Sequence, residues 1–256
     1  MSVHFDLRGR TALVTGASSG IGEQLARALA EQGAQVVLAA RRVDRIEDLA
    51  REITAKGGTA LAVALDVTDP QSVAAAYDKA EASLGVVDTI IANAGITEPG
   101  RSTDLPPEAI ERVFDTNLKG LYLTVREGAR RLIAAGSRED ERGRIILIGS
   151  ITAEMTNQGD AAYAASKAAV AHLGRQFARE WVRQGINVNT IQPGYIQTEL
   201  TGGWFDSEGG KQQIAGWHRR RIMDIDALDH AVSFLSSDLS RHITGATMTI
   251  DDGQSL

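Results

Sequence analysis

The chain has 256 residues, of which 43% are hydrophobic and 23% charged, an ordinary composition for one large α/β domain or two small ones. With 27 Lys and Arg against 33 Asp and Glu, the formal net charge of −6 excludes a global electrostatic attraction to nucleic acid or to an anionic membrane. The chain has no cysteine, which rules out a disulfide framework and a thiolate metal site.

The N-terminal sequence MSVHFDLRGR lacks the apolar core of a signal peptide. No run approaches the roughly 18 apolar residues of a membrane span. We therefore expect a cytoplasmic protein that acts on a small molecule and has neither a nucleic acid nor a membrane as its partner.

Apolar runs typical of buried strands alternate along the whole chain with segments that favour helices. The expected strands are 11–15, 35–40, 59–65, 87–94, 144–150, 186–192 and 246–251. The expected helices are 22–32, 44–56, 69–83, 107–135, one that carries Tyr163, and 225–235. This alternation is typical of right-handed βαβ units and of a parallel sheet covered on both faces. No linker or repeat interrupts it, so we predict one domain over residues 1–256, an α/β fold with a doubly wound, seven-stranded parallel sheet.

The first strand leads into a glycine-rich turn, TGASSGIG, at residues 15–22. Glycines at a strand-to-helix turn let the backbone approach a pyrophosphate, and the following helix supplies free N–H groups and the positive end of its dipole. The glycine spacing differs from the commoner dinucleotide fingerprint, but the order of strand, turn and helix is the one that such a site requires. We expect a phosphate-bearing ligand to bind here.

Two arginines, Arg41 and Arg42, follow the second strand, where an acidic residue would accept the ribose 2′-hydroxyl of NAD. Guanidinium groups suit a 2′-phosphate, which they bind with charge and paired donors. The pair therefore favours NADP(H) as the cofactor. The alternative is two solvated arginines at the start of a charged surface helix.

Two segments fall outside the alternation of strands and helices. Residues 137–143, SREDERG, form a charge run that we expect to be a solvated loop. Residues 198–223 contain two tryptophans and the glycine pairs Gly202-Gly203 and Gly209-Gly210. A connection of this length and composition predicts a hinged lid over a site, and the alternative is a packed surface excursion.

A tyrosine and a lysine lie four residues apart in the alanine-rich run around Tyr163 and Lys167, which places both side chains on one face of a helix. A nearby cation favours the phenolate, so we expect the pKa of Tyr163 to lie below its usual value of about 10. Ser150 ends an apolar strand, at the edge of the sheet where α/β proteins bind ligands. The three groups predict proton transfer to or from an oxygen, whereas the Tyr–Lys pair alone would also suit an interface tyrosine and a solvated lysine.

Several motifs in the same order together resemble the short-chain dehydrogenase/reductase family, and the resemblance covers the entire chain. They are TGASSGIG, Asn93-Ala94-Gly95, Asn117, the thirteen-residue step from Ser150 to Tyr163, Lys167, and Pro193-Gly194 followed by Thr198. The resemblance implies a single-domain Rossmann fold and a homotetramer, to which surplus apolar positions at Leu121, Leu123, Val125, Val170 and Leu173 would contribute.

The resemblance also implies a role for each matching residue. Tyr163 would protonate a carbonyl oxygen as hydride arrives, Ser150 would fix that oxygen, and Lys167 would lower the tyrosine pKa and bind the nicotinamide ribose. Asn117 would hold a water that relays protons, which completes the catalytic set of four. The implied cofactor-binding residues are Gly16, Ser18, Ser19, Gly20, Ile21, Gly22, Arg41, Arg42, Asp66, Val67, Asn93, Ala94, Gly95, Tyr163, Lys167, Pro193, Gly194, Ile196 and Thr198. The expected substrate pocket comprises Ser150, Thr152, Glu154, Met155, Tyr195 and Trp204, with Ile151, Thr97, Glu98 and Trp217 as further candidates.

The sequence thus predicts an oxidoreductase that transfers hydride from NADPH to a ketone, or the reverse alcohol oxidation. The alternatives are an NAD-dependent polyol or sugar dehydrogenase and, from another class, a dinucleotide-sensing protein without turnover. Three positions depart from the family pattern. Ser19 stands where some NADP-using relatives have a cation, Glu154 stands where a small or neutral residue is usual, and the end reads IDDGQSL, whose two aspartates are too few to predict a metal site.

Overall fold

The computed structural model describes residues 4–256, in which seven parallel strands form one sheet in the order β3-β2-β1-β4-β5-β6-β7. The strands are β1 (Thr11–Thr15), β2 (Gln35–Ala40), β3 (Thr59–Ala64), β4 (Thr89–Ala92), β5 (Gly143–Ile148), β6 (Ile186–Pro193) and β7 (Thr247–Ile250). Every residue of β1, β4 and β5 is buried, as continuous apolar runs in a parallel sheet require. The predicted Rossmann-type sheet is confirmed.

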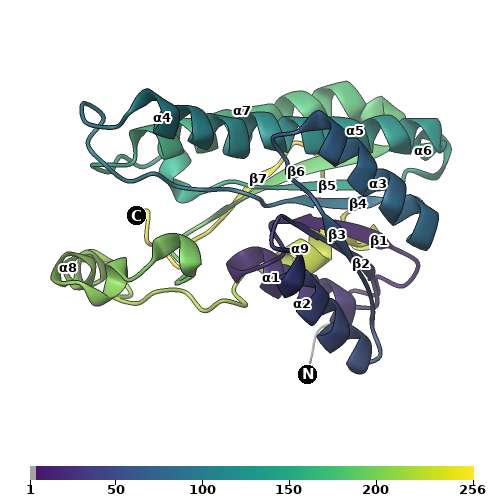
Figure 1. The fold of residues 1–256 in the computed structure, drawn as a ribbon, viewed down its shortest axis with the longest axis horizontal. Helices are drawn as coiled ribbons and strands as arrows, with labels where there is room; N and C mark the ends of the chain where they lie inside the picture. The colour runs from purple at the N-terminus through teal and green to yellow at the C-terminus, as the bar shows by residue number, and fades with distance from the viewer. Residues whose placement is uncertain (1–3) are drawn as a thin grey trace.

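Helices cover both faces of this sheet (Figure 1). One layer holds α3 (Pro70–Leu84), α4 (Pro107–Phe114), α5 (Leu121–Ala134) and α7 (Ala161–Trp181), and the other holds α1 (Gly20–Glu31), α2 (Val43–Ala55) and α9 (Asp229–Ser236). Tyr77, Val125 and Phe177 belong to the hydrophobic core of the first layer. Leu25, Ile46 and Val232 belong to that of the second.

The long helical region predicted at 107–135 contains a change of helix type. A π-helical turn, Asp115–Gly120, separates α4 from α5 and carries the fully buried Asn117. Turns of this kind are rare and are often found at functional sites, because they rotate side chains out of the regular helical register.

The loop predicted at 137–143 is partly wrong. Residues Ser137–Asp140 form a single helical turn, α6, and Gly143 already belongs to β5. Ser137 is buried, and its hydroxyl is satisfied by a 2.6 Å hydrogen bond that it donates to the carbonyl oxygen of Gln184. This long-range bond leaves no trace in the local charge pattern.

The connection after β6 contains short 3₁₀ helices at Glu199–Thr201 and Trp204–Asp206, followed by α8 (Glu208–Gly216), which projects from one end of the molecule in Figure 1. Its glycine pairs differ in role. A Cβ atom on Gly210 would lie 2.1 Å from the Trp204 carbonyl oxygen, so the second pair permits close packing. Gly202 has φ 52° and ψ −145°, a backbone conformation that suits glycine and a hinge.

Trp217 anchors this connection. Its ring stacks on Tyr195 with centroids 5.4 Å apart, and Phe205 packs against both rings. The Trp217 side chain is buried in this cluster, which fixes the far end of the segment against the body of the protein.

Candidate active site

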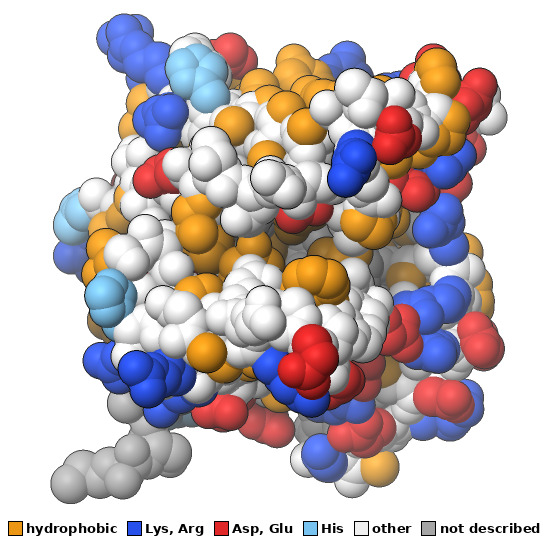
Figure 2. Space-filling view, turned by 90° about the vertical axis from the view of Figure 1, so that its left-hand side faces the viewer, with side chains coloured by type: hydrophobic (Ala, Val, Ile, Leu, Met, Phe, Trp, Pro, Cys, Tyr) orange, Lys and Arg blue, Asp and Glu red, His pale blue; other side chains and the backbone are white. Residues whose placement is uncertain are grey.

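A cavity of about 710 Å³ opens at the carboxyl ends of the strands. The strand order reverses between β1 and β4, and open α/β sheets bind their ligands at such a switch point. Figure 2 faces the end of the molecule from which α8 projects, and it shows hydrophobic side chains gathered around a hollow near the middle of that end.

The glycine turn after β1 leaves no room for side chains. A Cβ atom on Gly22 would lie 2.4 Å from the Gly16 carbonyl oxygen and 2.5 Å from Asn93 Nδ2. Gly16 and Gly20 have φ angles of 69° and 56°, in the left-handed region that favours glycine. Because α1 begins at Gly20, its free N–H groups lie at the turn, and the arrangement fits the pyrophosphate of a dinucleotide.

Thr15 ties this turn to the loop after β4. Its hydroxyl oxygen accepts 3.0 Å hydrogen bonds from the backbone N–H groups of Asn93 and Ala94. The Asn93 amide in turn donates to the Thr15 carbonyl oxygen at 2.9 Å. The two strand ends that flank the switch point are therefore held as one unit.

Arg41 and Arg42, at the expected adenosine end of the cavity, differ in the hydrogen bonds that their side chains make. Arg42 donates to Ser18 Oγ at 3.1 Å, to Ser19 Oγ at 2.6 Å and to Glu199 Oε2 at 2.8 Å. Arg45 also pairs with Glu199, and these two arginines hold the pKa of that carboxyl at about 2. Among residues 4–256, nothing accepts a hydrogen bond from the Arg41 side chain, although it lines the cavity as well.

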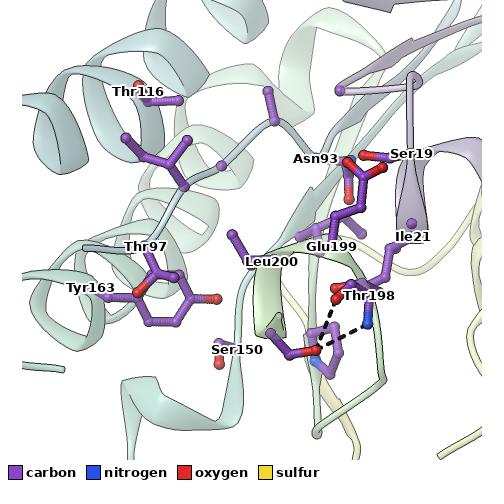
Figure 3. Close-up of a pocket in the computed structure, with 18 of the residues that line it drawn as sticks. Ser19, Ile21, Asn93, Thr97, Thr116, Ser150, Tyr163, Thr198, Glu199 and Leu200 are labelled. Carbon is purple, nitrogen blue, oxygen red and sulfur yellow. Dashed lines mark hydrogen bonds between the residues drawn. The ribbon is translucent and has the colours of Figure 1, made fainter. Parts of the chain in front are cut away.

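Tyr163 and Ser150 lie near each other at the other end of the cavity (Figure 3). Lys167 lines the same cavity. Ser150 follows β5, and its Oγ accepts hydrogen bonds from the Thr152 backbone N–H at 3.1 Å and from Thr152 Oγ1 at 2.9 Å. Lys167 is buried and donates to the Ile148 carbonyl oxygen at 2.9 Å, with Nζ 5.6 Å from the centre of the Tyr163 ring. The predicted catalytic trio is therefore brought together.

Burial dominates the acidity of both groups. It raises the pKa of Tyr163 to about 12, although a hydrogen bond with Ser150 acts in the opposite direction. Burial also lowers the pKa of Lys167 to about 8, because the ammonium has lost its water. The expectation that Lys167 brings the Tyr163 pKa below 10 is thus wrong for the protein alone, and the phenol is neutral at pH 7.

Asn117 forms side-chain hydrogen bonds that connect the loop after β4 to α7, the helix of Tyr163 and Lys167. Its Oδ1 accepts from the Ile96 N–H at 2.8 Å, while Nδ2 donates to the Ile96 carbonyl oxygen and to Ser166 Oγ. Ser166 then donates to the Tyr163 carbonyl oxygen at 2.6 Å. The π turn thereby joins the loop after β4 to the helix that carries Tyr163.

The cavity contains most of the residues predicted from the sequence. Of the predicted cofactor set, all but Gly22 line it, and Gly22 packs beneath the turn. Ser150, Thr152, Tyr195 and Trp204 line it, as do Thr97 and Ile151. Glu154 is exposed and does not line it, and neither do Met155, Glu98 and Trp217. The side chains that sequence reasoning missed include Asp160, Glu199, Leu200 and Thr201.

The sequence contains a signal for one of the residues that the prediction missed. Asp160 precedes Tyr163 by three residues, a spacing that places two side chains on neighbouring positions of a helix surface. In contrast, Leu200 and Thr201 reach the cavity only through the path of the chain after β6, for which no local pattern exists.

Within residues 4–256 no group of three or more His, Asp or Glu side chains is arranged to hold a metal ion. None of the helices in that range has the length and apolar character needed to cross a membrane.

Comparison with known proteins agrees with this geometry. A family model described as short chain dehydrogenase matches residues 10–209. The chain is 38% identical to cis-4-hydroxycyclohexanecarboxylate dehydrogenase of Sinomonas cyclohexanicum, with 95% of this chain and 96% of the relative covered.

Two solved structures are similar throughout. A short-chain type dehydrogenase/reductase from Mycobacterium marinum shares 38% identity at a TM-score of 0.91, with 98% of this chain and 97% of that chain covered. A gluconate 5-dehydrogenase from Burkholderia cenocepacia J2315, in complex with NADP and tartrate, shares 34% identity at a TM-score of 0.92 with the same coverage. The chain therefore belongs to the short-chain dehydrogenase/reductase family and is an oxidoreductase of the kind that binds a nicotinamide dinucleotide.

Proposed function

We propose that the protein reduces a ketone with NADPH and catalyses the reverse oxidation of the alcohol. The observation that carries this proposal is the meeting of Ser150, Tyr163 and Lys167 at one end of a cavity whose other end is lined by the glycine turn and two arginines. A dinucleotide that spans the cavity would therefore present its nicotinamide beside the phenol.

The reduced nicotinamide, when bound, supplies the hydride. Tyr163 is the acid, because a phenol with a pKa of about 12 keeps its proton at neutral pH until a carbonyl oxygen gains negative charge. Ser150 accepts two hydrogen bonds from Thr152, so its own proton, which interacts with the Tyr163 oxygen in the protein alone, would be donated to the substrate oxygen. In the oxidation direction the proton moves the other way, from the alcohol to the phenolate oxygen of deprotonated Tyr163, as the hydride leaves for the oxidised nicotinamide.

Lys167 and Asn117 have supporting roles in this proposal. The ammonium of Lys167 would bind the nicotinamide ribose and stabilise the tyrosinate that remains after proton transfer. Asn117 fixes the loop beside Gly95, where a Cβ atom would lie 3.3 Å from Asn117 Oδ1 and 3.6 Å from Lys167 Nζ. We assign to Asn117 the water that returns protons to Lys167.

The experiment that tests the reaction is an NADPH-oxidation screen over cyclic, aryl and β-keto carbonyl compounds, with Tyr163→Phe as the matched variant. We expect turnover by the wild type and a loss of about 10² to 10⁴-fold in the variant, with the cofactor Kd within twofold of wild type. Activity of the variant within tenfold of wild type contradicts the role of the phenol. A wild type that binds the cofactor but oxidises it with no compound is the outcome that a redox-sensing protein predicts.

The preference for NADPH rests on Arg41 and Arg42. Arg41 is the better candidate for the 2′-phosphate, because Arg42 already donates to two serines and Glu199 whereas Arg41 has no acceptor in the described residues. One good contact to a charged group contributes roughly 1.5–3 kcal/mol, which is a preference of about tenfold to a hundredfold. The solved relative in complex with NADP supports this choice.

The kcat/KM values for NADPH and NADH in wild type, Arg41→Asp and Arg42→Asp test the preference. We expect the larger shift toward NADH in Arg41→Asp. Equal efficiency with both cofactors in the wild type would show that the arginines are a solvated helix start.

Oxidation of a polyol or sugar acid is the second candidate reaction. The similarity to a gluconate 5-dehydrogenase favours it, and the same four catalytic residues would serve. Gluconate as a substrate in the oxidation direction, with NAD and NADP compared, separates it from the leading proposal.

We also propose a homotetramer. Leu121, Val125 and Val170, which the sequence offered as interface positions, are instead buried in the core of the protomer. A second apolar hollow of about 560 Å³ nevertheless lies between the π turn, α5 and α7, and it is lined by Leu118, Tyr122, Leu123, Ala169 and Leu173, among others. Tyr122 is 42% exposed there, and such a surface supports burial against another copy.

A further inference from the structure

We propose that Asp160 sets the charge preference of the substrate end of the cavity, so that neutral and amine-bearing ketones are favoured over ketones that carry a carboxylate. The inference rests on the carbonyl chemistry proposed above, and it adds a substrate class that the catalytic residues alone do not define.

Asp160 stands at the N-cap position of α7, three residues before Tyr163, and lines the cavity. Aspartate at this position usually caps its helix with a side-chain hydrogen bond, but the Asp160 side chain makes no such bond. Within residues 4–256 it takes part in no other side-chain hydrogen bond or ion pair. The carboxylate is therefore left to interact with whatever occupies the cavity.

Partial burial raises the pKa of Asp160 above its usual value, with desolvation as the cause. Burial is the main reason that the pKa values of Tyr163 and Tyr195 are raised, and the Asp160 charge adds to it for both phenols. The carboxylate thus acts on both phenols that border the substrate end, one of which is the catalytic acid. When the carbonyl oxygen of a substrate contacts Tyr163, the other groups of that substrate lie within the electrostatic field of the Asp160 carboxylate.

The other charged residues of the cavity do not balance this carboxylate. They are Arg41, Arg42, Asp66, Lys167 and Glu199. Arg42 pairs with Glu199. Hydrogen bonds from Thr68 lower the pKa of Asp66, and the charge of the Arg41 guanidinium lowers it further. Lys167 is buried, with Nζ donating to the Ile148 carbonyl oxygen.

The remaining lining of the substrate end is neutral. It includes Thr97, Ile151, Thr152, Tyr195, Leu200 and Trp204. Among the described residues, therefore, no free cation lies at the substrate end to receive a substrate carboxylate. A second negative charge in this partly desolvated space would be repelled by Asp160, whereas an ammonium would gain a charge-assisted hydrogen bond.

Three 4-substituted cyclohexanones of similar shape test the proposal at pH 7: the carboxylate, the carboxamide and the aminomethyl compound, which is a cation. The measurement is kcat/KM for each ketone with NADPH in excess. Ratios between the ketones are compared within each protein, so that any effect of a substitution on Tyr163 itself cancels.

The variants are Asp160→Asn and the control Glu154→Gln. Glu154 is a carboxylate six residues earlier in the same loop, but it is exposed and does not line the cavity. Asparagine keeps the shape of Asp160 and is itself a good N-cap residue. The order of the three ketones in the wild type is a test that needs no variant at all.

In the wild type we expect the carboxylate to be reduced at least tenfold less efficiently than the carboxamide, a difference of about 1.4 kcal/mol, and the aminomethyl compound to be the best of the three. Asp160→Asn should reduce the gap between carboxylate and carboxamide to about threefold or less, and Glu154→Gln should leave it unchanged. Equal efficiency for carboxylate and carboxamide in the wild type, or an unchanged gap in Asp160→Asn, overturns the proposal.

Calorimetric binding of the same ketones to the NADP⁺-loaded protein separates this inference from the proposed function. Binding in the predicted charge order without turnover supports the role of Asp160 and contradicts ketone reduction. Turnover without the charge order supports ketone reduction and overturns the role of Asp160. If none of the ketones is bound or reduced, both proposals fall.

Discussion

Replacement of Lys167 by methionine should stabilise the nucleotide-free protein while it abolishes catalysis. Lys167 is 4% exposed, and burial lowers its pKa from 10.5 to about 8. Each tenfold change in an equilibrium corresponds to about 1.4 kcal/mol, so keeping this ammonium buried at neutral pH costs about 3 kcal/mol of folding free energy. The hydrogen bond to the Ile148 carbonyl oxygen recovers part of that cost.

We therefore expect Lys167→Met to raise the free energy of unfolding by about 1–2 kcal/mol at pH 7, since methionine fills a similar volume without a charge. The gain should depend on pH. Between pH 8 and 10.5 the unfolded chain binds a proton at Lys167 that the folded chain has released, so the wild type becomes more stable as the pH rises. The advantage of the variant should shrink through this window.

The assay is urea unfolding of both proteins at pH 7 and pH 9.5, at equal protomer concentration. Lys79→Met is the control, because Lys79 is exposed and also donates to a backbone carbonyl oxygen, that of Ala62, at 3.0 Å. We expect the control to change stability by no more than about 0.5 kcal/mol at either pH. A Lys167→Met protein that is less stable than wild type at pH 7, or a gain that does not shrink at pH 9.5, would refute the reasoning.

Gly22→Ala should cost about 1–3 kcal/mol of stability and weaken dinucleotide binding, because its Cβ would lie 2.4 Å from the Gly16 carbonyl oxygen. The matched Gly216→Ala, at which no described residue brings a heavy atom within 4 Å of the new Cβ, should leave cofactor affinity unchanged in titration calorimetry. Hydrogen exchange across residues 198–223 should slow when cofactor and an unreactive substrate analogue are bound, and unchanged exchange would contradict the lid predicted from the sequence. Light scattering at micromolar concentration should give the mass of a tetramer. The mass of a dimer would support only half of that prediction, and the mass of a monomer would contradict it.

The sequence predicted the strands closely because each is a short apolar run bounded by polar or glycine residues. The meeting of Ser150, Tyr163 and Lys167 at one cavity was equally predictable, since the spacing of Tyr163 and Lys167 on a helix and the place of Ser150 after a strand are local properties. In contrast, the pKa of Tyr163 depends on burial by segments distant in the chain, and its direction was predicted wrongly.

Side-chain contacts between distant segments account for most of what the sequence did not reveal. The ion pair between Arg42 and Glu199 joins residues 157 positions apart. The π turn around Asn117 is stabilised by bonds to the loop after β4 and to Ser166, and not by its own sequence. The packing of Gly209 and Gly210 on Trp204 is likewise set by tertiary contact, which is why glycine pairs alone did not distinguish a hinge from a close approach.

The bond from Arg42 to Glu199 means that the segment after β6 and a bound 2′-phosphate would compete for one guanidinium. Glu199 belongs to the segment after β6, so that segment is attached to Arg42, one of the two arginines that we propose for the 2′-phosphate, and also to Arg45. A phosphate that recruits Arg42 would release Glu199, whereas a cofactor without it would leave the attachment intact. Binding linkage is reciprocal, so a detached segment would also favour the phosphorylated cofactor. Hydrogen exchange at residues 198–206 that is faster with NADP⁺ than with NAD⁺ would reveal this coupling, and identical exchange would exclude it.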